Sequence, residues 1–130
     1  MKRLAPKPRP GAEDVALRAL RAADRSRAEL EERLERRGFD AFERRQALDE
    51  LERLGYVDDE RTASLRAARL AERGYGDAYI RSDLEQRRLP TEAALTEIEP
   101  ESERLARFTS KGAAWLTRRG FALEGWGAVG

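Results

Sequence analysis

The stretch SRAELEERLERRGFD, residues 26–40, contains the signals for one complete helix, for its end and for the start of the next helix. Ser26 stands three residues before Glu29, which is the spacing of a capping box, where each side chain accepts a hydrogen bond from the other residue's backbone N–H. Leu30 and Leu34 are four residues apart and therefore share one face of a helix. The stretch predicts an amphipathic helix with a defined start.

The letters RGFD encode the end of this helix and the start of the next one. Gly38 can take the left-handed conformation that ends many helices, and Phe39 is placed to fold back on the last turn. Asp40 then stands three residues before Glu43, a second capping box. The following helix is expected to end at Gly55 and to have a buried apolar stripe made of Ala47, Leu48, Leu51 and Leu54.

The six letters LERRGF at residues 34–39 return almost unchanged as LTRRGF at residues 116–121. Between them, LEQRRL at residues 84–89 has the same leucine and arginine pattern, with Arg88 where glycine is expected. We expect Pro90 to break the helix there instead. An internal repeat of helix ends, without any sustained alternation of apolar and polar residues, predicts tandem helical units and no sheet.

The repeat leads to a predicted all-α fold of tandem three-helix repeats. We expect a basic, Pro-rich, disordered arm at 1–11, repeat 1 at 12–56, repeat 2 at 57–100, and a partial repeat 3 with a frayed Gly-rich end at 101–130. Asp58 or Asp59 is expected to cap the first helix of repeat 2 and Asp77 the second, and Ser102 is expected to open the last unit. Phe39, Tyr56 and Phe121 are expected in the core because each follows a helix-ending glycine.

The composition sets limits on the class of protein. Hydrophobic residues make up 40% and charged residues 39%, and only 7% is aromatic, so one large core is not expected. The chain has no cysteine, which excludes disulfides and thiolate metal sites. No apolar run approaches the roughly 20 residues that span a bilayer, and the N-terminus lacks the apolar core of a signal peptide. We expect a cytoplasmic protein without a membrane contact.

The residue inventory does not favour catalysis. Histidine is absent, so the usual general base near neutral pH is missing, and ordinary zinc sites lack their ligands. No glycine-rich loop follows a strand to hold phosphate. The acidic run at residues 58–60 is interpreted as a helix start, where carboxylates cap N–H groups, and not as a magnesium site. We therefore expect no catalytic residue, no metal and no cofactor.

Arginine supplies nearly all of the 26 basic side chains, and its planar fork suits carboxylates and phosphates better than lysine does. The spacing predicts one helical face with Arg18, Arg21 and Arg25 and another with Arg66, Arg69 and Arg73, and other arginines lie at the repeated helix ends. Each one alone is best interpreted as part of a solvated face paired with glutamate. As a set, they could form a basic stripe that faces an acidic partner or DNA phosphates. The candidates for partner binding are Arg18, Arg21, Arg25, Arg36, Arg37, Arg66, Arg69, Arg73, Arg81, Arg87, Arg118 and Arg119.

The run SRAELEERLERRGFDAFERRQALDELERLGYVDDERTA, residues 26–63, resembles the signature of the RecX family of bacterial recombination regulators. The combination of a Ser-capped helix, RGF and G-Y-[LV]-D-D-x-R-x-A carries the resemblance. YIRSDLEQRRL and AAWLTRRGF resemble the patterns of the second and third repeats, so that the resemblance covers about residues 13–126. The sequence departs from the pattern at Thr62, where an aromatic residue is usual, and at Tyr79, near a usual arginine.

The resemblance implies a fold and a function. RecX proteins are elongated, curved arrays of three-helix repeats that bind the RecA recombinase, chiefly its filament on single-stranded DNA. They lodge in the filament groove, inhibit ATP hydrolysis and strand exchange, and so regulate DNA repair and the SOS response, without enzymatic activity or a cofactor. We accordingly expect a monomeric RecA regulator, with weak contact to single- or double-stranded DNA as a further interaction. The alternative interpretation is a stand-alone helical module that binds nucleic acid.

Overall fold

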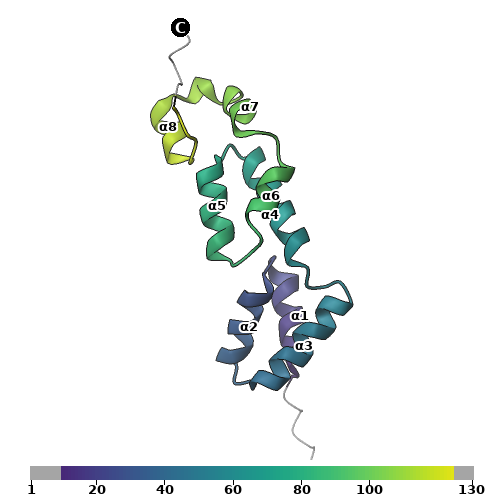
Figure 1. Cartoon of the computed structure of the whole chain (residues 1–130). Helices are drawn as coiled ribbons and strands as arrows, with labels where there is room; N and C mark the ends of the chain where they lie inside the picture. Colours follow the sequence, from purple (N-terminus) through teal and green to yellow (C-terminus); the bar gives the residue numbers. More distant parts are fainter. Residues whose placement is uncertain (1–9, 125–130) are drawn as a thin grey trace, which may run out of the picture. The chain divides into compact units, whose positions relative to one another are not determined.

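The computed structural model describes residues 10–124, and the chain divides into two compact units, with the boundary between Val57 and Asp58. All regular structure within residues 10–124 is helical, which confirms the predicted all-α class (Figure 1). No helix of the described part is both long and apolar enough to cross a bilayer. Residues 1–9 of the predicted arm and the glycines at 125, 127 and 130 of the predicted C-terminal end lie outside the described residues.

The first unit consists of three helices that each pack on the other two, namely α1 (Ala12–Ala22), α2 (Arg27–Arg36) and α3 (Ala41–Arg53). Both predicted capping boxes are confirmed. The Glu29 N–H donates to Ser26 Oγ at 3.0 Å, and the Ser26 N–H donates to the Glu29 carboxylate at 3.0 Å. The Glu43 N–H donates to the Asp40 carboxylate at 2.8 Å. The two helix starts are therefore fixed by local sequence.

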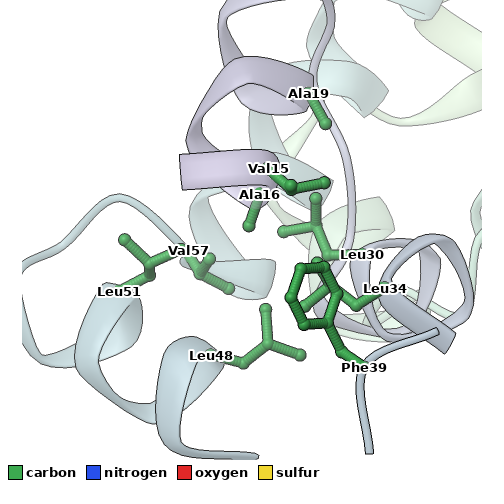
Figure 2. Close-up of a cluster of buried hydrophobic side chains, with 9 residues drawn as sticks. All are labelled: Val15, Ala16, Ala19, Leu30, Leu34, Phe39, Leu48, Leu51 and Val57. Carbon is green, nitrogen blue, oxygen red and sulfur yellow. The ribbon is translucent and has the colours of Figure 1, made fainter. Parts of the chain in front are cut away.

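The core of the first unit gathers side chains from all three helices and from the turns between them (Figure 2). Gly38 has the expected positive φ of 88°, and the Phe39 N–H donates to the Leu34 carbonyl at 3.1 Å. Phe39 is thereby turned inward, as predicted, and its ring lies in the cluster. The buried members are Val15, Ala16, Ala19, Leu30, Leu34, Phe39, Leu48, Leu51 and Val57.

Two residues expected in this core are on the surface instead. Leu54 is 52% exposed and Tyr56 is 57% exposed. The carbonyl of Leu51 accepts hydrogen bonds from the N–H groups of both Tyr56 and Val57, at 2.8 and 3.1 Å. This tight turn brings Val57 into the core and leaves Tyr56 facing solvent, so the predicted core position is wrong by one residue.

The second unit repeats the arrangement with α4 (Asp59–Glu72), α5 (Asp77–Gln86) and α6 (Glu92–Glu97). Asp58 caps α4, because its carboxylate accepts from the Arg61 N–H at 3.0 Å. The unit has its own buried cluster, which consists of Ala63, Ala67, Leu70, Ile80, Leu84, Leu89 and Ala94. Two separate small cores, in place of one large core, agree with the low aromatic content.

Arg88 makes the turn at the end of α5 itself, with a positive φ of 56°. Its N–H donates to the Glu85 carbonyl at 3.0 Å, and the Leu89 N–H donates to the Leu84 carbonyl at 3.0 Å. These are the same two bonds that Gly38 and Phe39 make after α2. The expectation that Pro90 replaces the missing glycine is therefore wrong, because the backbone keeps the same shape with an L residue in the left-handed conformation.

Within the second unit, α7 (Glu101–Ala106), a 3-10 turn (Thr109–Lys111) and α8 (Ala113–Arg118) follow α6. The helix α7 begins at Glu101, one residue earlier than the predicted opening at Ser102. The third copy of the repeated helix end has the predicted form, since Gly120 has a φ of 86° and Phe121, which is buried, donates its N–H to the Leu116 carbonyl at 3.1 Å.

The N-terminus of α5 is capped by residues that lie far along the chain, and not by Asp77 as predicted. Gly76 occupies the cap position and Asp77 is the first helical residue. The N–H groups of Gly76 and Ala78 donate to the carbonyls of Arg119 and Gly120, at 2.6 and 3.2 Å. The Asp77 N–H donates to the Glu101 carboxylate at 2.8 Å.

This contact requires glycine at position 76. A Cβ on Gly76 would lie 2.4 Å from the backbone of Gly120, and a Cβ on Gly120 would lie 2.5 Å from the backbone nitrogen of Tyr79. The repeated helix end after α8 therefore has a specific task, which is to satisfy the exposed backbone donors at the start of α5.

Candidate partner-binding surface

Seven of the twelve candidate arginines have exposed side chains. In the first unit, Arg18 and Arg21 lie three residues apart on α1, and Arg36 and Arg37 lie at the end of α2. In the second unit, the exposed members are Arg69 and Arg73 at the end of α4 and Arg118 on α8. These seven side chains are accessible to a binding partner in the folded protein.

Arg25 does not share the helical face of Arg18 and Arg21, because α1 ends at Ala22. Its side-chain Nε donates instead to the carbonyl of Ala19 at 3.2 Å, and the residue is half-buried. Arginine near a helix end stabilises the last carbonyls in this way. The predicted three-arginine face is therefore reduced to two residues, and Arg25 belongs to the fold of the first unit.

Three more candidates form ion pairs within the second unit. Arg66 on α4 forms a two-pronged ion pair with Asp83 on α5, in which the second prong measures 2.8 Å. Arg87, one turn along α5, lies 3.6 Å from the same carboxylate. The hydrogen bond from Arg66 and the charges of Arg66 and Arg87 lower the pKa of Asp83 below its ordinary value, against the effect of burial.

Arg81 connects α5 to α6, because its Nε donates to the Glu92 carboxylate at 2.8 Å. That hydrogen bond lowers the pKa of Glu92 and raises the pKa of Arg81. Both side chains of this pair are solvent-accessible, and such pairs stabilise a fold only slightly. The first unit has comparable connections that the sequence analysis did not single out, from Arg27 to Asp49 at 2.7 Å and from Arg44 to Glu31 at 2.6 Å.

Arg119 is half-buried in a stack of aromatic rings. Its guanidinium carbon lies 4.3 Å from the ring centroid of Tyr75 and 4.8 Å from that of Trp115. A guanidinium between two ring faces is attracted by both. The structure therefore separates Arg119, which packs α8 against the start of α5, from its neighbour Arg118, which points outward.

Arg104 is the arginine that the sequence analysis missed. It is 2% exposed, and its guanidinium donates to the carbonyls of Glu99 and Tyr75, at 2.9 and 2.8 Å, and to the carboxylate of Asp77. It connects α7 to the start of α5 through a fully bonded guanidinium. Nothing in its local sequence distinguishes it from the solvated arginines, because its partners are 5 to 29 residues away.

The acidic run at residues 58–60 forms a helix start in the described part of the chain. No group of three or more potential ligand residues within 10–124 could hold a metal ion. Asp58 accepts a backbone N–H and lies 3.8 Å from Arg61, as a helix cap does. The protein is thus of the class of all-helical proteins built from three-helix units, with arginine as the main outward-facing functional group.

Comparison with known proteins shows which proteins of this class the chain is similar to. Residues 12–51 match the family model of the first three-helix domain of RecX. A relative described as Regulatory protein RecX, from Syntrophotalea carbinolica, is 40% identical over 84 residues, which cover 63% of this chain and 54% of the relative. The chain thus spans about half the length of the curated relative that it matches. Over these residues the chain is similar to RecX regulatory proteins, which agrees with the resemblance seen in its sequence.

Proposed function

We propose that this protein binds the RecA recombinase, chiefly its filament on single-stranded DNA, and restrains ATP hydrolysis and strand exchange by RecA. The similarity of residues 12–51 to the first three-helix domain of RecX supports this proposal, and so does the name of the relative, a regulatory protein. The observation that carries it is the separation of the arginines into two groups. Five are half-buried and contact residues of their own unit, and the other seven, which occur in both units, have exposed side chains.

Outward arginines suit an acidic protein surface. A guanidinium can form two parallel hydrogen bonds to one carboxylate, and arginine is enriched where interfaces bind most strongly. Binding along a filament would restrain the ATPase without any catalytic group in the regulator, so the protein acts as a non-enzymatic, monomeric binder. Attraction between the arginines and an acidic surface would also raise the rate of association. A higher ionic strength would therefore lower that rate.

The test is the DNA-dependent ATPase of RecA, measured with increasing amounts of the purified protein. Wild type should lower the rate and should co-sediment with filaments. The double variant Arg69→Glu with Arg73→Glu, and separately Arg18→Glu with Arg21→Glu, should inhibit less at equal concentration. Arg66 is left intact, since its replacement would break the ion pair with Asp83 inside the unit.

A charge-matched control is the double variant Arg53→Glu with Arg61→Glu. Both arginines are exposed, lie outside the candidate set and pair with an acid one helical turn away. This control should inhibit as wild type does, and circular dichroism should show equal helicity in all variants. If wild type leaves the ATPase rate unchanged and does not sediment with filaments, the proposal is wrong.

The alternative function, a stand-alone nucleic-acid-binding module, predicts a different outcome. DNA binding would then weaken steeply with salt, because each phosphate contact releases counterions, and added RecA would change nothing. Titration of labelled DNA with and without RecA, at two salt concentrations, separates the two functions.

A further inference from the structure

The second unit contains a continuous stack of three rings and one guanidinium. The rings of Tyr79 and Tyr75 are parallel to within 19°, with centroids 4.1 Å apart. On the other side of Tyr75 lies the guanidinium of Arg119, at 4.3 Å, followed by Trp115 at 4.8 Å from the same guanidinium. Residues from the start of α5 and from α8 thus form one ladder with the order Tyr79, Tyr75, Arg119, Trp115.

One end of this ladder is closed and the other is open. Beyond Trp115, the ring of Phe108 lies with its centroid 5.8 Å away, and both rings lie against Gly74, where an added Cβ would be 3.0 Å from Trp115. Tyr79 is 39% exposed, although one face of its ring is covered by Tyr75. Tyr79 thus keeps solvent-accessible area beyond its contact with Tyr75.

Packing alone accounts for most of this ladder but not for Tyr79. Arg119 and Gly120 cap α5 through their carbonyls, and Tyr75 and Trp115 hold Arg119 in place. The contact with Gly120 uses only the backbone and the Cβ of Tyr79. The phenol ring extends the ladder toward solvent without closing a core.

The charges around the ladder are mainly positive. Lys111 Nζ lies 5.9 Å from the Trp115 ring, and Arg118 is exposed beside Arg119 on the same turn. The nearest acids on α5 are already paired, since Asp77 binds Arg104 and Asp83 binds Arg66. An anionic ligand that approaches Tyr79 would therefore meet cations in excess.

The next turns of α5 offer hydrogen-bonding groups on the same side. Ser82 and Gln86 lie three and seven residues after Tyr79, and both are exposed. Residues at these spacings share a helical face with Tyr79. The Gln86 amide lies 3.4 Å from the Ser82 hydroxyl, so that the amide and the hydroxyl form one polar group pair beside the open ring.

We propose that Tyr79 is a stacking step for an unpaired base of a single-stranded nucleic acid, with Arg118 contacting a phosphate of the same strand. An open aromatic face next to cations is how proteins bind single strands without reading their sequence. In this ladder the guanidinium of Arg119 serves as one layer of the stack. The inference goes beyond the proposed function, because this contact does not need RecA.

The experiment measures binding of a fluorescently labelled oligothymidylate to the full chain by anisotropy, without RecA. Tyr79→Ala should weaken binding by about five- to 150-fold, the range for loss of one stacked base. The alanine keeps the Cβ that lies against Gly120. Tyr79→Phe should bind as wild type, and the control Tyr56→Ala removes a more exposed tyrosine from the first unit and should change nothing.

Two further arms test the chemistry. With an abasic oligomer of equal length, which has phosphates but no bases, wild type and Tyr79→Ala should bind equally. In a salt titration, Tyr79→Ala should keep the wild-type slope of log affinity against log salt concentration. Arg118→Ala should reduce the size of that slope by about one. An oligouridylate in the same assay distinguishes RNA from DNA as the source of the strand.

The proposal is overturned if Tyr79→Ala binds oligothymidylate as tightly as wild type, or if it loses the abasic oligomer to the same extent. Retained helicity by circular dichroism excludes unfolding as the cause of any loss. The RecA ATPase assay on the same variants tests the proposed function independently of the stacking proposal. A variant that loses the oligomer but still inhibits RecA would support both proposals, and absence of inhibition by wild type would leave the stacking result intact.

Discussion

Arg88 shows that the repeated helix end depends on backbone geometry more than on glycine itself. An L residue in the left-handed region costs roughly 1–2 kcal/mol, which the two hydrogen bonds to Glu85 and Leu84 and the burial of Leu89 offset. Gly38, Gly55, Gly74 and Gly120 take the corresponding conformation at the other helix ends.

Arg88→Gly is expected to stabilise the second unit by about 0.5–1 kcal/mol. Glycine removes the strain of the positive φ but adds entropy to the unfolded chain, and the net gain is the difference. Native-state hydrogen exchange of the α5 amides measures it. The opposite change, Gly55→Ala, serves as the control. No atom lies within 4 Å of the new Cβ, so the expected destabilisation of about 1 kcal/mol comes from the positive φ alone. A destabilised Arg88→Gly would contradict this account of the turn.

Arg104→Met should destabilise the second unit by about 3 kcal/mol. Loss of one partner of a buried ion pair costs about 3–5 kcal/mol, and the lower end applies because the side chain of Asp77 is 33% exposed and can be rehydrated. Hydrogen exchange in increasing urea measures the change in the free energy of unfolding of the second unit, with the amides of α1–α3 as the internal reference.

A companion variant, Arg104→Lys, should recover less than half of that loss, because an ammonium cannot reach two carbonyls and a carboxylate in one plane. A cost below about 1 kcal/mol for Arg104→Met would mean that the two carbonyls and Asp77 find other partners.

At the scale of elements, the sequence predicted helix ends that are encoded locally. Ser26 with Glu29 and Asp40 with Glu43 are each three residues apart, and a capping box needs nothing else. The α5 start was mispredicted at Asp77 because its real acceptors, Glu101, Arg119 and Gly120, come from a later segment. Local pattern holds no information about such partners.

The same limit applies to the candidate surface. Helical spacing grouped Arg66 with Arg69 and Arg73, but could not show that Arg66 faces Asp83 on another helix. Spacing also cannot distinguish Arg104, which is buried, from Arg107 one turn later, which is largely exposed. The exposed and the packed arginines differ in tertiary neighbours, and those are known only from the fold.

The Asp83 ion pair makes the contact between α4 and α5 sensitive to acid. Because Arg66, and then Arg87, lower the pKa of Asp83 in the folded unit, the stabilisation is complete above the ordinary aspartate pKa of 3.8. It should be lost progressively as the pH falls from that value through the lowered pKa of Asp83. Asp83→Asn should remove this part of the acid dependence and lower the stability at neutral pH.

This effect is measured by thermal unfolding at a series of pH values between neutral and about pH 3. The ring signals of Tyr75 and Tyr79 report unfolding of the second unit. Equal acid dependence in wild type and Asp83→Asn would show that the ion pair does not contribute.

At the scale of the whole molecule, the two units differ in how they are completed. The first unit caps α2 and α3 with its own Ser26 and Asp40. The second unit takes the cap of α5 and the fixed guanidinium of Arg104 from the α7–α8 segment. A chain that ends after Pro100 should therefore keep exchange-protected amides in α1–α3 and lose them in α4–α6.

Heteronuclear NMR on the shortened chain measures this protection for each residue. The milder variant Gly76→Ala keeps the full chain but places a Cβ 2.4 Å from Gly120, and it should weaken the same helices selectively. Full protection of α5 in both variants would show that the cap is dispensable.

The remote cap of α5 also has a consequence for biosynthesis. A ribosome delivers the chain from its N-terminus, and domains generally fold as they emerge. The first unit can close as soon as Val57 is free of the exit tunnel. The start of α5 must remain with unsatisfied backbone donors until Arg119 and Gly120 have emerged. The second unit therefore completes its fold only after Gly120 has emerged, and until then the start of α5 is exposed to chaperones and proteases.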